Sequence, residues 1–139
     1  MADLRVADVM TSAPQTILAD EPIAVAAQLM EMEDVGDVIV VDKSRICGVV
    51  TDRDIAIRGV SHGLDPAMPV DAICSPDVAT VTPDTSIDTA ISLMRDRAVR
   101  RLPVIENSTL FGIISLGDLA IERDPHSVLA EISAAPPNR

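Results

Sequence analysis

Aromatic residues are almost missing from this chain of 139 residues. It has no tryptophan and no tyrosine, and Phe111 is its single phenylalanine. Positive charge is scarce as well, because 11 Lys and Arg stand against 22 Asp and Glu, which gives a net charge of −11. Proteins that hold single strands use aromatic rings as stacking platforms, and phosphate backbones require a basic surface. We therefore expect no nucleic acid among the partners of this protein.

Long apolar runs are also missing. No stretch approaches the roughly 18 consecutive apolar residues that a membrane-spanning helix requires, so we expect no membrane partner. The first ten residues, MADLRVADVM, lack the apolar core and the leading basic cluster of a signal peptide. The sequence therefore predicts a cytoplasmic protein.

Cysteine is rare, with Cys47 and Cys74 as the two thiols. Both lie among apolar neighbours, and free cysteine often behaves as a small buried hydrophobe. Because disulfides are uncommon in the cytosol, we expect two buried thiols, with a disulfide or a redox role as the alternative. The chain has only 2 histidines, and these are not closely spaced with the cysteines. No metal site is predicted from such a pattern.

Aliphatic residues, in contrast, are abundant, and they are arranged twice. Hydrophobic residues make up 47% of the chain. When the chain is shifted by about 64 residues, 6–59 aligns with 70–123 without a gap. A copy of ~54 residues is barely large enough to be stable alone, so we expect the two copies to form one compact body with pseudo-twofold symmetry. Identical residues at equivalent positions include Thr16 and Thr80, Gly48 and Gly112, and Asp54 and Asp118.

Each copy has the pattern strand, helix, strand, strand, helix, which predicts an α/β (α+β) fold of two βαββα repeats. In the first copy we expect strands at 16–18, 38–41 and 46–51, and helices at 22–34 and 52–58. In the second copy we expect strands at 78–81, 102–105 and 110–115, and helices at 83–98 and 116–122. Asp20 is the expected N-cap of the first helix, and Gly59 is the expected end of helix 52–58.

The sequence divides into four segments. They are the first repeat with its leader (1–60), a linker with glycine and prolines (61–69), the second repeat (70–124), and a last short helix with a tail (125–139). The leaders at 6–10 and 70–74 are each expected to form a short helix that feeds its own copy.

A polar motif follows the last strand of each copy. It reads glycine, two aliphatic residues, a hydroxyl residue, two variable residues and aspartate, at 48–54 and again at 112–118. The hydroxyl residues, Thr51 and Ser115, lie where a strand ends and a helix begins, a place that favours an anion. Asp54 and Asp118 follow on the first helical turn, where a carboxylate can accept hydrogen bonds from the paired hydroxyls of a ribose. The alternative is a capping box without a ligand, which has the same spacing.

These features resemble a tandem pair of cystathionine-β-synthase (CBS) domains, also called a Bateman module. The similarity covers residues 6–123, and both copies match the family's motif Gly-h-h-Thr/Ser-x-x-Asp, where h is aliphatic. The segment 100–104, Arg-Arg-Leu-Pro-Val, also resembles the start of a strand in that family. The resemblance implies that an adenosine-type nucleotide binds in clefts between the repeats, with ribose on the aspartate, phosphate on the hydroxyl residue, and the base between aliphatic groups.

Carried over position by position, the resemblance implies two sets of nucleotide-binding residues. The first copy supplies Thr16, Ile17, Asp37, Val38, Thr51 and Asp54, to which the sequence adds Arg53 as a cation near the phosphate. The second copy supplies Thr80, Val81, Arg100, Arg101, Leu102, Pro103, Ser115 and Asp118.

The two sets are not equivalent. Arg100 and Arg101 are candidates for a phosphate clamp, whereas the first copy has Gly36 and Asp37 at these positions. Asp37 would repel a phosphate, and Arg53 would have to supply the missing cation. We therefore expect unequal sites, of which one is occupied. The alternative for the three arginines is a solvated surface or an ion pair within this acidic chain.

The resemblance implies a stand-alone regulatory module rather than an enzyme. His62 and His126 have no patterned partner, and we expect no catalytic residue and no required cofactor. AMP, ADP or ATP is the expected ligand, with S-adenosylmethionine or NAD as second choices. We expect a homodimer that uses the apolar helical faces at 26–30 and 90–94, and an effector protein as a further partner. The alternative function is a ligand-free structural or stress-associated interaction protein.

Overall fold

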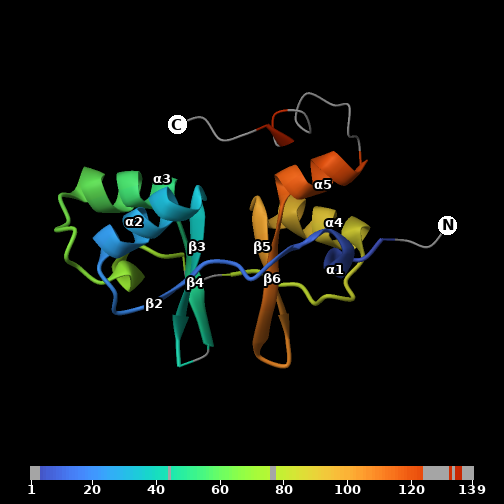
Figure 1. Ribbon diagram of the computed structural model, residues 1–139, viewed down its shortest axis with the longest axis horizontal. Coiled ribbons are helices and arrows are strands. Elements are labelled where there is room, and N and C mark those ends of the chain that lie inside the picture. Colours follow the sequence, from blue (N-terminus) through green and yellow to red (C-terminus); the bar gives the residue numbers. More distant parts are fainter. Residues whose placement is uncertain (1–3, 44, 76–77, 124–131, 133, 136–139) are drawn as a thin grey trace. The chain divides into compact units, whose positions relative to one another are not determined.

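The computed structural model describes residues 4–43, 45–75, 78–123, 132, 134 and 135 (Figure 1). The expected last helix and tail at 125–139 lie almost entirely outside the described residues. The chain divides into two compact units. The copy-one unit is Pro14–Val78, and the copy-two unit is Met1–Ala13 with Ala79–Arg139. Each unit mixes helices with a three-stranded sheet, so the predicted α/β class is confirmed.

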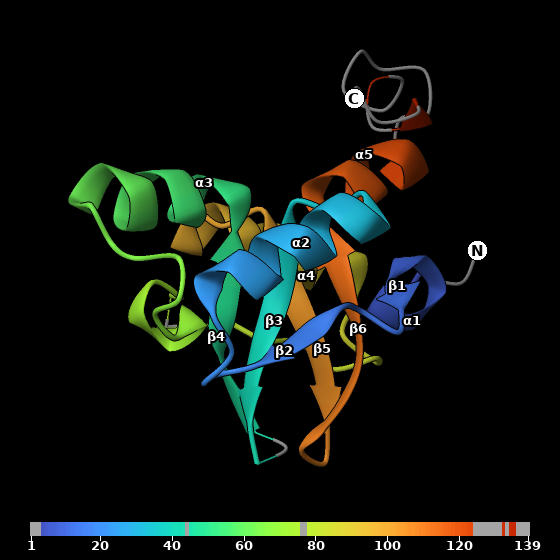
Figure 2. The ribbon, with the colours of Figure 1, turned by 60° about the vertical axis from the view of Figure 1, so that its left-hand side comes forward.

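The copy-one unit is built on the sheet β2-β3-β4. Its strands are β2 (Thr16–Leu18), β3 (Asp37–Asp42) and β4 (Arg45–Thr51), with β2 parallel and β4 antiparallel to β3. Helix α2 (Ile23–Glu33) lies beside this sheet (Figure 2). After β4 come α3 (Asp52–Asp54), the π-helix η1 (Ile55–Gly59), and the 3₁₀ helices η2 (Val60–His62) and η3 (Val70–Ala72).

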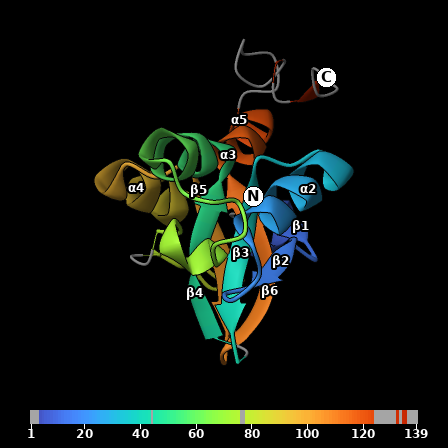
Figure 3. The ribbon, with the colours of Figure 1, turned by 90° about the vertical axis from the view of Figure 1, so that its left-hand side faces the viewer.

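The copy-two unit is built on the sheet β1-β6-β5. It contains α1 (Val6–Val9), β1 (Thr11–Ser12), α4 (Ile87–Arg97), β5 (Arg101–Glu106), β6 (Thr109–Ser115) and α5 (Leu116–Arg123). Strand β6 lies antiparallel to both β5 and β1, and it runs directly into α5 (Figure 3). This junction positions the polar motif of the second copy.

The strand predicted at 78–81 does not form. Val81 makes only an isolated parallel bridge with Val104. In the first copy, the amide of Ile39 donates to the carbonyl of Gln15 at 2.9 Å, which anchors the start of β2. Pro103 occupies the position equivalent to Ile39 and has no N–H to donate. The second copy therefore loses this hydrogen bond, and its first strand is reduced to a bridge.

The two leaders are exchanged between the units instead of feeding their own copies. The amide of Val6 donates to the carbonyl of Thr85 at 2.8 Å, and the equivalent Val70 donates to Glu21 at 2.7 Å. Both valines are fully buried, each in the core of the unit that contains the other copy. Figure 1 shows α1 on the side of α4 and α5 accordingly. Each leader belongs to the unit of the other copy because its valine is buried in the core of that unit.

The linker at 61–69 caps a helix. The amides of Ile23 and Ala24 donate to the carbonyls of Met68 and Pro66, at 2.9 and 3.0 Å. These bonds satisfy the first N–H groups of α2, whose N-cap is Pro22 without a side-chain bond. The prediction that Asp20 is the N-cap was therefore wrong.

The helix that follows β4 does not end at Gly59, as the sequence predicted. It continues through η1 and η2 to His62 and ends at Gly63, whose φ is +67°. This left-handed conformation is one that glycine adopts at little cost. A π-helical turn such as η1 often lies near a functional site.

The helical faces proposed for dimer formation lie inside the units. Ala26 and Met30 belong to the core of the copy-one unit, and Ala90 and Met94 belong to the core of the copy-two unit. Their burial favours an ordinary internal core for these faces, and the homodimer stays a prediction. Among the described residues, no helix is both long and apolar enough to cross a lipid bilayer.

Both cysteines are free, but they differ in exposure. Cys74 is buried at 8% exposure, and Cys47 is half-buried beside the same core. Burial raises the pKa of the Cys74 thiol above its ordinary value, and the nearby Cys47 and Asp71 raise it further.

We expect iodoacetamide at pH 8 to alkylate Cys47 well before Cys74 in the folded protein. A raised pKa leaves Cys74 with less thiolate at this pH, and its burial limits access. Its alkylation rate should still be increasing at pH values where an ordinary thiol has reached its plateau. Peptide mass spectrometry over a time course measures both rates, and equal rates would contradict the packing described for Cys74.

Candidate functional site

The two copies of the polar motif form equivalent strand-to-helix corners. We call Thr51–Asp54 the first corner and Ser115–Asp118 the second corner. In the first, the amide of Thr51 donates to Asp54 Oδ2 at 2.9 Å, and the amide of Asp54 donates to Thr51 Oγ1 at 3.1 Å. In the second, the same two bonds between Ser115 and Asp118 measure 3.0 and 3.1 Å. The capping box considered from the sequence is therefore present in both copies.

The capping bonds do not use up the polar atoms of a corner. Each aspartate gives Oδ2 to its cap, and its other oxygen, Oδ1, takes no part in the capping box. Each hydroxyl oxygen accepts one amide, and a hydroxyl that accepts can still donate its own proton. A corner can therefore offer one carboxylate oxygen to the hydroxyls of a ligand and one O–H to an anion.

The second corner opens into a cavity of about 340 Å³. The cavity is lined by Arg100, Arg101, Ser115, Leu116, Gly117, Asp118 and Ile121. Strand pairing explains why these residues meet, because Arg101 is the register partner of Ser115. The amide of Leu116 also donates to the carbonyl of Arg100 at 2.8 Å, which ties the start of α5 to the residue before β5.

The charges in this cavity are arranged for a ligand with both an anionic and a hydroxyl-bearing end. Arg100, Arg101 and Asp118 all line this cavity, so two cationic residues and one carboxylate residue are brought together there. Guanidinium groups bind phosphate through charge-assisted hydrogen bonds. The start of α5 adds backbone amides, which also favour an anion.

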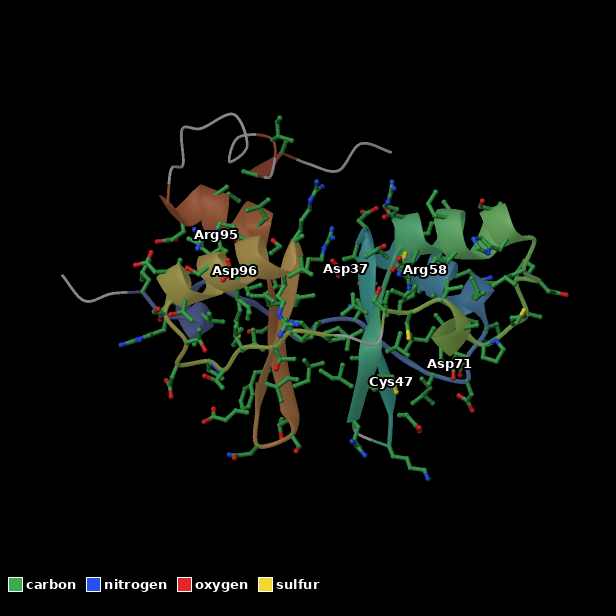
Figure 4. All side chains as sticks on the ribbon, turned by 180° about the vertical axis from the view of Figure 1, so that it is seen from behind. Asp37, Cys47, Arg58, Asp71, Arg95 and Asp96 are labelled. Atoms are coloured by element: carbon green, nitrogen blue, oxygen red, sulfur yellow. The ribbon has the colours of Figure 1, made fainter. Side chains whose placement is uncertain are left out.

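The first corner has different neighbours. Asp37 is the register partner of Thr51, at the place that Arg101 holds in the second copy. The side chain of Asp54 is 17% exposed, and its Oδ1 lies 3.8 Å from Nε of Arg58. Figure 4 labels Asp37 and Arg58. Arg53, which the sequence offered as a substitute cation, is exposed on α3.

Several residues predicted from the family pattern have their side chains inside the cores. They are Ile17, Val38, Val81, Leu102 and Pro103. Thr16 and Thr80 are exposed, and neither lines the cavity at the second corner. The structure thus brings together four of the predicted residues, Arg100, Arg101, Ser115 and Asp118, around one cavity.

Sequence reasoning missed Leu116 and Ile121 as lining residues. Ile121 lies three residues after Asp118 in α5, so helical spacing places the two on one face. Leu116 is 41% exposed and Ile121 is 36% exposed. Ile121 can be predicted from the sequence by counting three residues, about one helical turn, onward from Asp118 of the motif. Within the described ranges, no group of three or more Cys, His, Asp or Glu could hold a metal ion.

The chain matches known proteins over most of its length. It is 37% identical to the CBS domain-containing protein YhcV of Bacillus subtilis, over 85% of this chain and 84% of that protein. A crystal structure of Hypoxic Response Protein I with two coordinated zinc ions has a TM-score of 0.76 and 31% identity, covering 86% of this chain and 98% of that one. A hexameric CBS-CP12 protein from bloom-forming cyanobacteria has a TM-score of 0.77 and 29% identity, covering 93% and 79%. The CBS domain family itself matches residues 6–59 and 70–124, and the chain therefore belongs to the CBS domain family, with two such domains in tandem.

Proposed function

We propose that this protein is a stand-alone CBS-pair regulatory module that binds an adenosine-type nucleotide at the second corner. The observation that carries the proposal is the cavity at this corner, where two arginines, a serine hydroxyl and an aspartate meet. The proposed role is regulatory rather than catalytic, since the relatives reported above carry CBS domains. The signal would pass through a change of shape or to a partner protein in the cytoplasm.

The proposed ligand contacts follow from the chemistry of the wall. Phosphate oxygens accept hydrogen bonds from Arg100 and Arg101 and from the hydroxyl of Ser115. Ribose hydroxyls donate to Oδ1 of Asp118, the oxygen outside the capping box. Leu116 and Ile121 offer exposed aliphatic surface against which a purine can pack.

The size of the cavity favours a mononucleotide. Its volume of about 340 Å³ lies at the small end of the roughly 300–1,000 Å³ typical of small-molecule sites. NAD carries two nucleotides and would need more room. AMP, ADP and ATP are therefore preferred over NAD, and also over S-adenosylmethionine, which has no phosphate for the arginines.

A thermal-shift panel with AMP, ADP, ATP, S-adenosylmethionine and NAD tests this proposal. A ligand that binds only the folded protein stabilises it by mass action, by about 2.7 kcal/mol when the ligand concentration is 100 times its Kd. The melting temperature rises accordingly. We expect a shift with at least one adenine mononucleotide and a smaller one with NAD. No shift with any of the five would favour the alternative function, a ligand-free interaction protein.

Replacing both Arg100 and Arg101 by glutamine should weaken ATP binding by roughly 10- to 100-fold. Each lost charge-assisted hydrogen bond costs about 1.5–3 kcal/mol at most, and part of this is screened at an exposed site. Affinity for adenosine should stay nearly unchanged, because adenosine has no phosphate. Calorimetric titrations of the variant with both compounds test this, and equal losses for both would contradict the assignment of phosphate to this wall.

Self-association is a second part of the proposal. The hexameric CBS-CP12 protein shows that a structural relative assembles into oligomers. In this chain the exposed apolar residues Ile57 and Val60 on η1 and η2, 49% and 74% exposed, are candidates for a homodimer contact. Native mass spectrometry of the purified protein would show its oligomer mass together with any small molecule that it retains.

A further inference from the structure

We propose that Arg58 is the counter-ion of Asp54 and thereby prevents a nucleotide from binding at the first corner. Each chain then binds one nucleotide, at the second corner. This inference rests on the proposed function and adds to it a residue that decides which of the two corners is used.

The contacts of Arg58 carry the first step. Asp54 has two carboxylate oxygens, and Oδ2 is held by the amide of Thr51. Its Oδ1, the oxygen that a ribose would need, lies 3.8 Å from Nε of Arg58. The same guanidinium donates from Nη1 to the carbonyl of Ile73 at 3.5 Å. Arg58 is therefore held from two sides, and a ligand hydroxyl has to compete with it for Asp54.

The second copy shows what the corner looks like without this arginine. The position equivalent to Arg58 is Glu122, one helical turn after Asp118. Glu122 is exposed, and a second carboxylate cannot neutralise the first. Among the residues that the structure describes, Asp118 makes no ion pair. Its Oδ1 therefore lacks the competing cation that Asp54 has, and a cavity lies beside it.

The remaining neighbours act in the same direction. The first corner has Asp37 in register with Thr51, where the second corner has Arg101. An anion entering the first corner therefore meets an aspartate that already has its counter-ion, and it finds no arginine at the register position that Arg101 holds in the second copy. The alternative role for Arg58 is that of a phosphate ligand, since a guanidinium can bind either partner.

Exchanging the two equivalent residues separates these roles. The variant Glu122→Arg installs at the second corner the arrangement found at the first, and Glu122→Gln removes the charge without adding a guanidinium. Calorimetry with the tightest binder among AMP, ADP and ATP should give one site per wild-type chain. Glu122→Arg should bind about two- to fivefold more weakly, the range that an exposed ion pair supports, and Glu122→Gln should match the wild type.

The sign of the change decides the outcome. An arginine that did not close the corner would attract the phosphate and tighten binding. Equal or tighter binding by Glu122→Arg, or two sites of similar affinity in the wild type, would overturn the proposal. Weaker binding by Arg58→Gln at the observed site would also overturn it, because Arg58 would then be a ligand-binding residue.

A second measurement does not depend on any ligand. The Nε–H signal of Arg58 in a ¹⁵N NMR spectrum should move in Asp54→Asn and stay in place in Asp118→Asn. A signal that ignores Asp54→Asn would overturn the ion pair, and with it the proposal. If the signal responds but no nucleotide binds to the wild type, the ion pair stands, the proposed nucleotide function is wrong, and the assignment of sites that rests on it falls too.

Discussion

Replacing Gly112 by alanine is expected to lower the free energy of unfolding by about 3 kcal/mol, and Gly48→Ala is expected to cost at least as much. A Cβ on Gly112 would lie 2.5 Å from the carbonyl oxygen of Thr11 and 2.9 Å from Sδ of Met10. A Cβ on Gly48 would overlap the carbonyl oxygen of Ser75 even more closely. Since both obstacles include backbone, relief requires the leader to move away from the sheet. Overpacking of this kind typically costs about 1–3 kcal/mol of stability, and the cost is larger when the backbone must shift.

Gly59→Ala is the matched control for these two variants. Nothing lies within 4 Å of the position that its Cβ would take, and its φ of −92° is open to any residue. Alanine there should leave stability unchanged or raise it by up to about 1 kcal/mol, the usual gain over glycine in a helix. Urea unfolding followed by circular dichroism measures all three variants. A Gly112→Ala protein as stable as Gly59→Ala would contradict the close passage of the leader over β6.

This passage gives a structural reason for the glycine that opens each motif. Thr11 and Ser12 of β1 are the register partners of Ile113 and Gly112. Ser75, the equivalent of Thr11, accepts a hydrogen bond from Val49, next to Gly48, and donates one to it. Each glycine therefore leaves room for the leader that precedes the other copy in the sequence. The motif can be found in the sequence, but the reason for its glycine cannot, because the sequence pattern places each leader in its own copy.

The parts of the fold that follow local rules were predictable. The hairpins at 38–51 and 102–115 and the helix beginning at Leu116 follow from runs of β-branched residues and from the capping pattern. The parts that depend on distant contacts were not. The exchange of Val6 and Val70 is decided by burial in another core, and the loss of the strand at 78–81 is decided by the missing N–H of Pro103.

The same division applies to the candidate site. Ser115, Asp118 and the two arginines were predicted, because the motif fixes the corner and strand register brings residues 101 and 115 together. The role inferred for Arg58 was not predicted. It depends on a side chain that reaches the carbonyl of Ile73, and this residue belongs to an exchanged leader. The second copy has Glu122 at the position equivalent to Arg58, and this difference makes the contact interpretable.

Asp118→Ala is expected to weaken nucleotide binding by roughly 5- to 150-fold, which corresponds to about 1–3 kcal/mol for a hydrogen bond to a charged group. The variant also loses the bond from the amide of Ser115, so the capping contribution of about 1 kcal/mol is removed from stability. Loss of binding could then result from the weakened corner alone. A control has to lose the same cap without losing the proposed ribose contact.

Asp54→Ala provides this control, because Asp54 and Asp118 form the same capping box in equivalent corners. Both variants should unfold at lower urea concentrations, and the exposed Asp54–Arg58 ion pair should add little to the loss of the cap. In our account only the second corner binds the ligand, so Asp54→Ala should keep nearly the wild-type affinity. The two variants therefore separate the structural role of the aspartate from its role in binding.

The most direct test is a calorimetric titration of AMP, ADP and ATP into the wild type, Asp54→Ala and Asp118→Ala under the same conditions. We predict one site per chain in the wild type, an unchanged Kd in Asp54→Ala, and a Kd at least fivefold higher in Asp118→Ala. Equal affinities in all three proteins, or no heat of binding with any of the nucleotides, would contradict a nucleotide site at the second corner.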